Sequence, residues 1–116
     1  MIEPGILEIR TTFPSRAAAV ACADGLVRAR LAACVQVDGP IASTYRWQGA
    51  VETADEWRCS CKTTVEFRDA CLAAIGRGHP YETPELLVVE AAATPAYAAW
   101  LRASLGSTSN SSEGDG

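Results

Sequence analysis

Two long segments of alternating residues, joined by a tight turn, restrict the fold of this chain most. In residues 33–47, one face of an extended strand carries Val35, Val37, Ile41 and Tyr45. In residues 51–62, one face carries Trp57, Cys59 and Cys61. The turn at residues 47–49 ends in glycine, as tight hairpin connections often do. The pattern predicts a long β-hairpin, bent where Gly39-Pro40 interrupts the first strand and requires a bulge.

Shorter patterns on either side of the hairpin predict the remaining elements. Residues 6–13 resemble a strand, and residues 16–31 resemble a helix whose apolar face holds Val20, Val27 and Leu31. A capping box at residues 63–66 predicts a second helix, with Thr63 and Glu66 bonding each other's backbone amides. The buried face expected for that helix consists of Phe67, Cys71 and Ile75.

The C-terminal third predicts one more strand and one more helix. Residues 86–90 form an apolar run, which we expect to be buried on at least one face. Thr94 and Pro95 then suit the N-cap and first turn of a short helix, whose apolar stripe is Tyr97, Trp100 and Leu101. The resulting order is strand, helix, strand, strand, helix, strand, short helix. This order predicts an α+β ferredoxin-like fold, an antiparallel sheet with both long helices on one face.

Size and composition limit the class of protein. With 116 residues, the chain suits one domain, which we place at residues 1–105, followed by a disordered polar tail at 106–116. The net charge of -4 and the lack of a basic cluster argue against a nucleic-acid partner. No apolar run is long enough to predict a membrane span, and no secretory signal is visible, so we expect a cytoplasmic protein. The odd number of cysteines, five, favours reduced thiols.

One short segment, residues 79–85, concentrates the chemistry. Its sequence is His-Pro-Tyr-Glu-Thr-Pro-Glu, and His79 is the only histidine of the chain. The two prolines restrict the backbone, so a stiff loop could hold the imidazole near Glu82 or Glu85. Such a loop could bind a metal or support acid-base chemistry. The alternative is a purely structural turn between a helix and a strand.

Several segments together resemble the CutA family of divalent-cation-tolerance proteins. They are residues 29–35, residues 43–49, Glu56 with Lys62-Thr63, residues 79–85, and Tyr97 with Trp100-Leu101. The resemblance implies a ferredoxin-like homotrimer without a required cofactor and without an established reaction, involved in tolerance of copper and other divalent cations. The residues themselves predict that other copies of the chain cover one face of the sheet, because that face lacks helices and the hairpin is rich in apolar and aromatic side chains.

The same resemblance implies the residues of a site. The family's pocket falls on Tyr45, Trp47, Lys62, His79, Tyr81, Glu82 and Glu85. For a divalent metal, copper or zinc, we expect His79 and Glu82 as ligands. Cysteines that some relatives place near a copper site align with Thr11 and near Ala74 here. Weaker binding through harder ligands, imidazole and carboxylate, is therefore expected.

The remaining cysteines and two alternative functions stay open at this point. Cys59 and Cys61 are expected inside the protein rather than on a metal, whereas Cys34 faces the other way and is the thiol expected to be accessible. One alternative function is a signalling or scaffold trimer, similar to the PII proteins, that binds a small anionic metabolite or a protein partner near Lys62. The other is an enzyme that uses His79 as a general base, although no paired nucleophile is recognisable.

Overall fold

The computed structural model describes residues 1–106 and shows the predicted order of elements. In chain order these are β1 (Glu3–Phe13), α1 (Arg16–Arg28), β2 (Cys34–Trp47), β3 (Ala50–Thr64), a 3-10 turn (Val65–Phe67), α2 (Arg68–Arg77), β4 (Leu87–Ala93) and α3 (Pro95–Ala103). The predicted tail lies outside the described residues from position 107 onward. Gly106 itself is placed, and its backbone amide donates a hydrogen bond to the carbonyl of Arg30.

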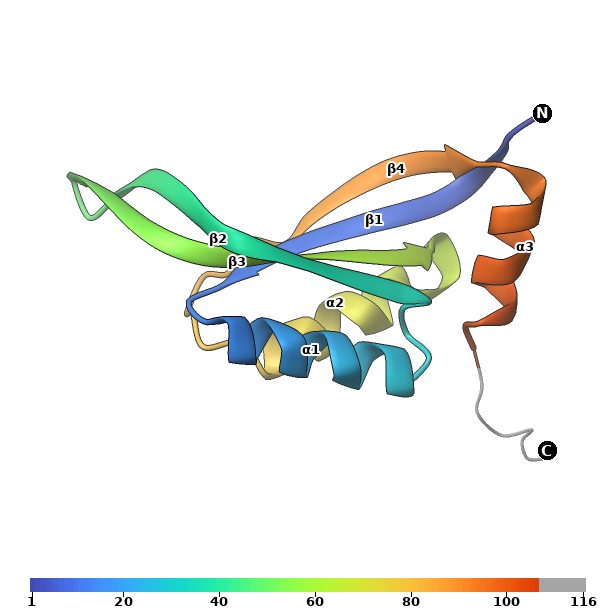
Figure 1. Ribbon diagram of the computed structural model, residues 1–116, viewed down its shortest axis with the longest axis horizontal. Helices are drawn as coiled ribbons and strands as arrows, with labels where there is room; N and C mark the ends of the chain where they lie inside the picture. Colours follow the sequence, from blue (N-terminus) through green and yellow to red (C-terminus); the bar gives the residue numbers. More distant parts are fainter. Residues whose placement is uncertain (107–116) are drawn as a thin grey trace.

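The four strands form one antiparallel sheet in the order β2-β3-β1-β4. This is the strand order of the ferredoxin-like fold, so the predicted fold class is confirmed. The helices α1 and α2 lie side by side under one face of the sheet, and α3 packs at the opposite end from the hairpin turn (Figure 1). The hairpin of β2 and β3 projects well beyond the two long helices as a two-stranded arm (Figure 1).

The main core lies between the sheet and the two long helices. Register pairs Ile9 with Cys61 and Thr11 with Cys59, so these side chains point to the helix-covered face. Both cysteines are fully buried, as the sequence pattern predicts. Burial raises the pKa of the Cys61 thiol well above its ordinary value, so this thiol stays neutral and packs as a small apolar group.

The bend of the hairpin is located where the sequence predicts it. The register between β2 and β3 shifts between Asp38 and Ile41, which makes room for a bulge. A β-carbon on Gly39 would lie 2.6 Å from Cδ1 of the Trp57 ring and 2.9 Å from the carbonyl oxygen of Glu56. Only glycine therefore lets the indole pack against the backbone at this bulge.

Two predicted details of the helices are wrong. In α1 the buried residues are Ala19 and Leu26, whereas Val20 and Val27 are exposed. Small alanine side chains let the helix approach the sheet closely, so the interface follows shape more than hydrophobicity. The capping box does not form either, because β3 continues to Thr64 and the Thr63 hydroxyl donates to the carbonyl of Leu31, 2.8 Å away.

The C-terminal elements expose apolar side chains that the sequence predicts to be buried. In α3 only Ala98 and Leu101 are buried, while Tyr97 and Trp100 lie together on the surface, with ring centroids 5.6 Å apart. On the edge strand β4, Leu87 and Val88 are exposed. The prediction of a buried strand is therefore wrong for the single chain. β4 is an edge strand that pairs with a neighbour on one side only, and no long helix covers it.

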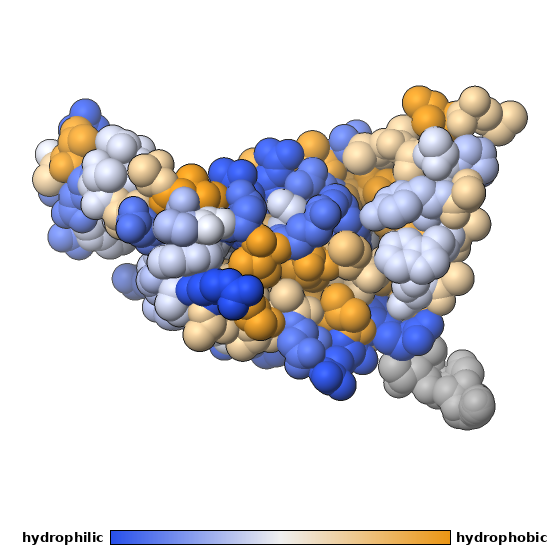
Figure 2. Space-filling model, in the orientation of Figure 1, coloured by the Kyte–Doolittle hydropathy of each residue, from blue (hydrophilic) through white to orange (hydrophobic). Residues whose placement is uncertain are grey.

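The face of the sheet opposite α1 and α2 is more polar than the sequence suggests. Hydrophilic residues gather over the middle of the sheet, and apolar areas lie along its border toward α1 (Figure 2). On the open face, Glu8 pairs with Arg10 and Asp38 pairs with Arg58. Within residues 1–106, no helix combines the length and the apolar character that a membrane span requires.

Candidate functional site

The loop between α2 and β4 reaches the base of the hairpin arm, and a hollow of about 790 Å³ lies between them. Its wall is formed by the outer halves of β2 and β3, the end of β1, and the loop. The lining residues are Thr12, Ser43, Thr44, Tyr45, Trp47, Glu52, Glu56, Pro80, Tyr81, Glu82, Thr83, Pro84 and Glu85. Segments about 30 residues apart in sequence thus meet at one cavity.

The hollow contains five of the seven residues that the sequence assigns to a pocket: Tyr45, Trp47, Tyr81, Glu82 and Glu85. Alternation along β2 places Tyr45 and Trp47 on one face, and the register sets Tyr45 opposite Glu52. The two prolines of the loop form part of the same wall. The chemistry of the hollow is therefore acidic and aromatic.

The charged side chains that line this hollow are all acidic. Glutamates from two elements line it, Glu52 and Glu56 from β3 and Glu82 and Glu85 from the loop. Of the described residues that line the hollow, none is lysine, arginine or histidine. Low-dielectric walls strengthen the field of carboxylates inside a concave site. Such a hollow attracts cations and repels anions.

His79 lies behind this wall and not in it. Its ring stacks on Phe13, with centroids 4.3 Å apart and planes 16° apart. The backbone amide of Tyr81 donates to Nδ1 at 3.1 Å, so Nδ1 carries no hydrogen. In the neutral ring Nε2 then carries the hydrogen and donates to the buried Thr11 hydroxyl, also at 3.1 Å. The imidazole thereby fastens the loop to the last residues of β1.

Burial sets the protonation of this imidazole. It lowers the pKa of His79 below its ordinary value, and a hydrogen bond to the Thr12 backbone and the negative charge of Glu56 offset the effect only in part. The neutral ring is the form that accepts the hydrogen bond from the Tyr81 amide. Both ring nitrogens of His79 take part in hydrogen bonds, so a metal could bind the ring only in place of one of them.

Tyr81 connects the loop to the hairpin. Its hydroxyl donates to Oε2 of Glu56 at 2.9 Å, so strand β3 and the loop are joined across the hollow. Burial and the Glu56 carboxylate raise the pKa of Tyr81 to about 12. The phenol therefore stays neutral at physiological pH and continues to donate this hydrogen bond.

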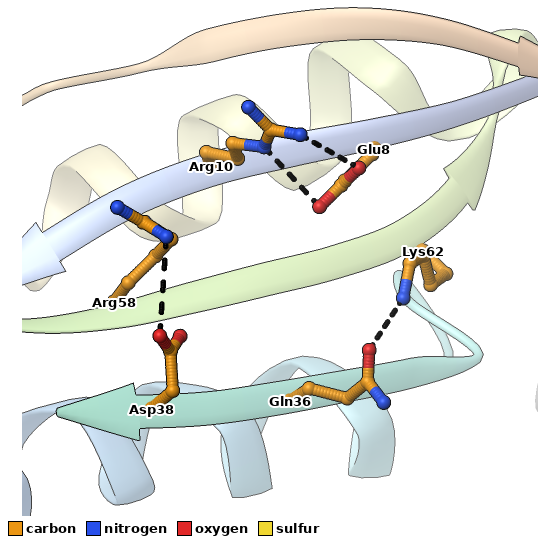
Figure 3. Close-up of polar contacts among 6 residues, drawn as sticks. All are labelled: Glu8, Arg10, Gln36, Asp38, Arg58 and Lys62. Carbon is orange, nitrogen blue, oxygen red and sulfur yellow. Dashed lines mark hydrogen bonds and ion pairs between the residues drawn. The ribbon is translucent and has the colours of Figure 1, made fainter.

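Lys62 and Cys34 lie outside the hollow. They face each other across β2 and β3 near the end of the hairpin that is far from its turn. Lys62 Nζ donates to Oε1 of Gln36 at 2.6 Å, on the open face of the sheet (Figure 3). Cys34 is partly exposed on the same face. The sequence groups Lys62 with the pocket, but the structure places it among the charged residues in the middle of the sheet (Figure 3).

Glu52, Glu56 and Thr12 are lining residues that the sequence interpretation missed. Counting outward from the turn at residues 48–49 places Glu52 opposite Tyr45, so the hairpin pattern could have revealed it. The same count places Glu56 opposite Ile41, and it fails only beyond that pair, where the register shifts between Asp38 and Ile41. No local signal marks Thr12, which reaches the hollow only through the pairing of β1 with β3.

The carboxylates of the hollow are spread over its wall. In the part of the chain that the structure describes, no group of three or more histidine, cysteine, aspartate or glutamate side chains is close enough to hold a metal ion. Ala74, which the resemblance places near a second metal-binding position, lies instead beside a smaller cavity between α1 and α2. The site of this single chain thus offers dispersed negative charge and no preformed chelate.

These features define a class: an α+β protein of ferredoxin-like topology with a projecting hairpin and an acidic, aromatic hollow at its base. The family described as CutA1 divalent ion tolerance protein matches residues 7–104, and the chain belongs to this family. A curated relative from Pectobacterium atrosepticum, named divalent-cation tolerance protein CutA, is 38% identical over 98 residues. The match covers 84% of this chain and 89% of the relative.

Solved structures agree with this assignment. The CutA structure from Xylella fastidiosa superposes with a TM-score of 0.85 at 33% identity, covering 88% of this chain and 99% of that one. CutA from Synechococcus elongatus PCC7942, complexed with a Bis-Tris molecule, gives a TM-score of 0.84 at 40% identity, covering 90% of this chain and 98% of that one. Both the fold and the family membership are therefore established.

Proposed function

We propose that this chain is a non-enzymatic homotrimer that binds divalent cations, copper(II) or zinc, in the acidic hollow. The observation that carries the proposal is the hollow itself, with its glutamates from β3 and the loop. Among its described lining residues no basic side chain neutralises them. Glu82 is the proposed main ligand. His79 is the proposed second ligand, and it binds the metal once its ring gives up one of its hydrogen bonds. The free thiols of the chain suit a reducing cytoplasm.

The relatives support a cation as the ligand. The curated relative is named a divalent-cation tolerance protein. The thiols of Cys59, Cys61 and Cys71 are buried and do not line the hollow. Oxygen ligands favour divalent ions over copper(I), which prefers thiolates.

The geometry favours this function over the two alternatives. An anionic metabolite would meet the glutamates of the hollow, while Lys62, its expected partner, lies elsewhere on the sheet. A general base at His79 would need access to substrate. Its ring instead lies against Phe13, and the one hydroxyl bonded to it, that of Thr11, is fully buried. Neither alternative gains an observation of its own.

Exposed apolar surface supports the homotrimer. Large side chains are exposed on the hairpin, on β4 and on α3, among them Val51, Leu87 and Tyr97. The arm formed by β2 and β3 is covered by no helix of its own chain (Figure 1). Isolated two-stranded ribbons are marginally stable in water, so packing against other copies would stabilise this one.

Calorimetric titration with Zn(II) and Cu(II) tests the metal site. We expect the native protein to bind both ions and Glu82→Gln to bind about tenfold more weakly, since one charged contact is worth roughly 1.4 kcal/mol. The control is Glu90→Gln, an exposed glutamate of β4 outside the hollow, which should bind like the native protein. His79→Ala tests the second ligand.

The outcomes separate the parts of this proposal. If the folded native protein takes up neither ion, the divalent-cation site is wrong. Equal heats for the native protein and His79→Ala would remove His79 from the ligands and leave Glu82 in place. A parallel loss in Glu82→Gln and Glu90→Gln would show a nonspecific effect of charge and refute the assignment to the hollow.

A further inference from the structure

We infer that the hollow also accepts a small organic ammonium ion, with a linear diamine as the best-matched class. The inference rests on the proposed function in one respect, because both need the hollow to be a cation site. It adds the class of ligand that the size, charge and aromatic side chains of the site would select. The size, the charge and the aromatic side chains each support this class of ligand.

The volume of the hollow is the first property that favours an organic ligand. A volume of about 790 Å³ lies within the usual range for small-molecule pockets, roughly 300 to 1,000 Å³. A bare divalent ion needs only a shell of ligands about 2 to 2.6 Å from its centre. The hollow is therefore large for a single ion and suits an organic molecule of several heavy atoms.

The distribution of charge is the second step. The glutamates come from two sides of the hollow, Glu52 from the hairpin and Glu82 from the loop. No three acidic or metal-binding side chains of the described residues converge on one point. Carboxylates that are separated in this way suit a ligand whose positive charges are also separated. A diamine has that property, and a point charge does not.

The aromatic side chains are the third step. Tyr45, Trp47 and Tyr81 line the same hollow as the glutamates. Aromatic faces attract ammonium groups through their ring quadrupole and also pack against methylene groups. Tyr81 stays in place because its hydroxyl donates to Glu56. Methylene groups of a diamine would contact the rings while its ammonium groups reach the carboxylates.

A series of four-carbon probes tests the inference by calorimetry on the full chain. Putrescine carries two ammonium groups, 1,4-butanediol is neutral and succinate carries two carboxylates. We expect putrescine to bind, with weaker binding at higher salt, and the other two to give no heat. Trp47→Leu should weaken putrescine binding about two- to fivefold, as expected for one cation–π contact.

Matched variants separate the hollow from general effects. Trp100→Leu removes an exposed tryptophan of α3, and Glu90→Gln removes an exposed glutamate of β4, both outside the hollow. Both should bind putrescine as the native protein does, whereas Glu52→Gln should bind it severalfold more weakly. Equal binding by Trp47→Leu and Trp100→Leu, or equal binding of putrescine and butanediol, would overturn the inference.

A zinc titration in parallel distinguishes this inference from the proposed function. Trp47→Leu should leave zinc binding unchanged, because an indole is not a zinc ligand. Zinc binding without putrescine binding overturns the inference and leaves the proposed function intact. Putrescine binding without zinc binding overturns the divalent-metal proposal and supports the inference. Absence of both overturns both.

Discussion

The single histidine of the chain anchors the loop in this structure. Its Nδ1 accepts from the Tyr81 amide, its Nε2 contacts Thr11, and its face stacks on Phe13. The contacts with Thr11 and Phe13 join the loop to the end of β1, and the contact with Tyr81 holds the loop's own backbone. The position of Tyr81, and with it one wall of the hollow, therefore depends on a neutral imidazole.

The lowered pKa of His79 makes stability depend on pH. Its pKa is lower in the folded than in the unfolded protein, so between these two values the unfolded protein binds more protons. The stabilisation by the neutral ring is complete above the unfolded pKa near 6.5 and is lost as pH falls toward the folded pKa. We expect the melting temperature to fall between pH 7.5 and 5.5, measured by circular dichroism.

His79→Asn is the control for this prediction. Its side-chain oxygen can accept from the Tyr81 amide in place of Nδ1, yet it does not titrate. Because the chain contains no other histidine, the variant should show a flatter pH profile over the same range. Parallel profiles for the two proteins would contradict the role given to His79.

At the scale of elements, the bulge in β2 is where the hairpin changes direction. Gly39 lies against the Trp57 ring and the Glu56 carbonyl, so the bend and the packing of the indole depend on a missing side chain. Beyond the bulge, the open-face side chains of the two strands form most of the hairpin wall of the hollow. The bulge therefore aims Tyr45 and Trp47 at the site.

A pair of glycine substitutions tests the bulge. Gly39→Ala should lower the free energy of unfolding by about 1 to 3 kcal/mol, because its β-carbon overlaps Trp57 and backbone. Gly25→Ala, in α1 with open space around it, should raise it by up to about 1 kcal/mol. Urea denaturation measures both. Equal effects of the two substitutions would show that the contact at Gly39 is unimportant.

Local patterns predict the elements well, and fail where tertiary contacts decide. The alternation around Cys59 and Cys61 predicts both their strand and their burial, because a half-buried strand has a period of two. The exposed Val20 and buried Ala19 of α1 could not be predicted, since close approach of helix and sheet favours the smaller side chain. Thr63 likewise found a partner in Leu31, distant in sequence.

The candidate site was predictable in part. The stiff loop is a local feature and identifies Glu82 and Glu85, whereas Tyr45 and Tyr81 come from the family resemblance. Alternation alone puts Tyr45 on the face of Val35 and Val37, and this prediction is wrong because the register shifts between Asp38 and Ile41. The partners of His79 and Tyr81, which are Thr11 and Glu56, come from strands far away in sequence. Their contribution depends on how the loop packs against β1 and β3 in the folded protein, which single-sequence patterns do not give.

At the scale of the whole molecule, the exposed apolar surface lies only partly where the sequence suggests. The middle of the open sheet face carries ion pairs such as Arg10 with Glu8, whereas apolar side chains are exposed at the hairpin, β4 and α3 (Figures 2 and 3). An assembly that covers this surface would therefore use the arm and the edges of the sheet together with a polar face.

Light scattering coupled to gel filtration measures the assembly. We expect a mass three times the 12.2 kDa of one chain, maintained on dilution to micromolar concentration. Circular dichroism of the same fractions confirms that the protein is folded. A folded species of 12.2 kDa at this concentration would refute the homotrimer, but it would leave the fold and the family unchanged.

The walls of the hollow belong to two parts of the chain. One wall is the projecting arm, the other is the loop, and the bond from Tyr81 to Glu56 spans them. If neighbouring copies immobilise the arm, assembly and ligand binding become thermodynamically linked. The factor by which assembly tightens the affinity for a cation is then the factor by which that cation stabilises the assembly.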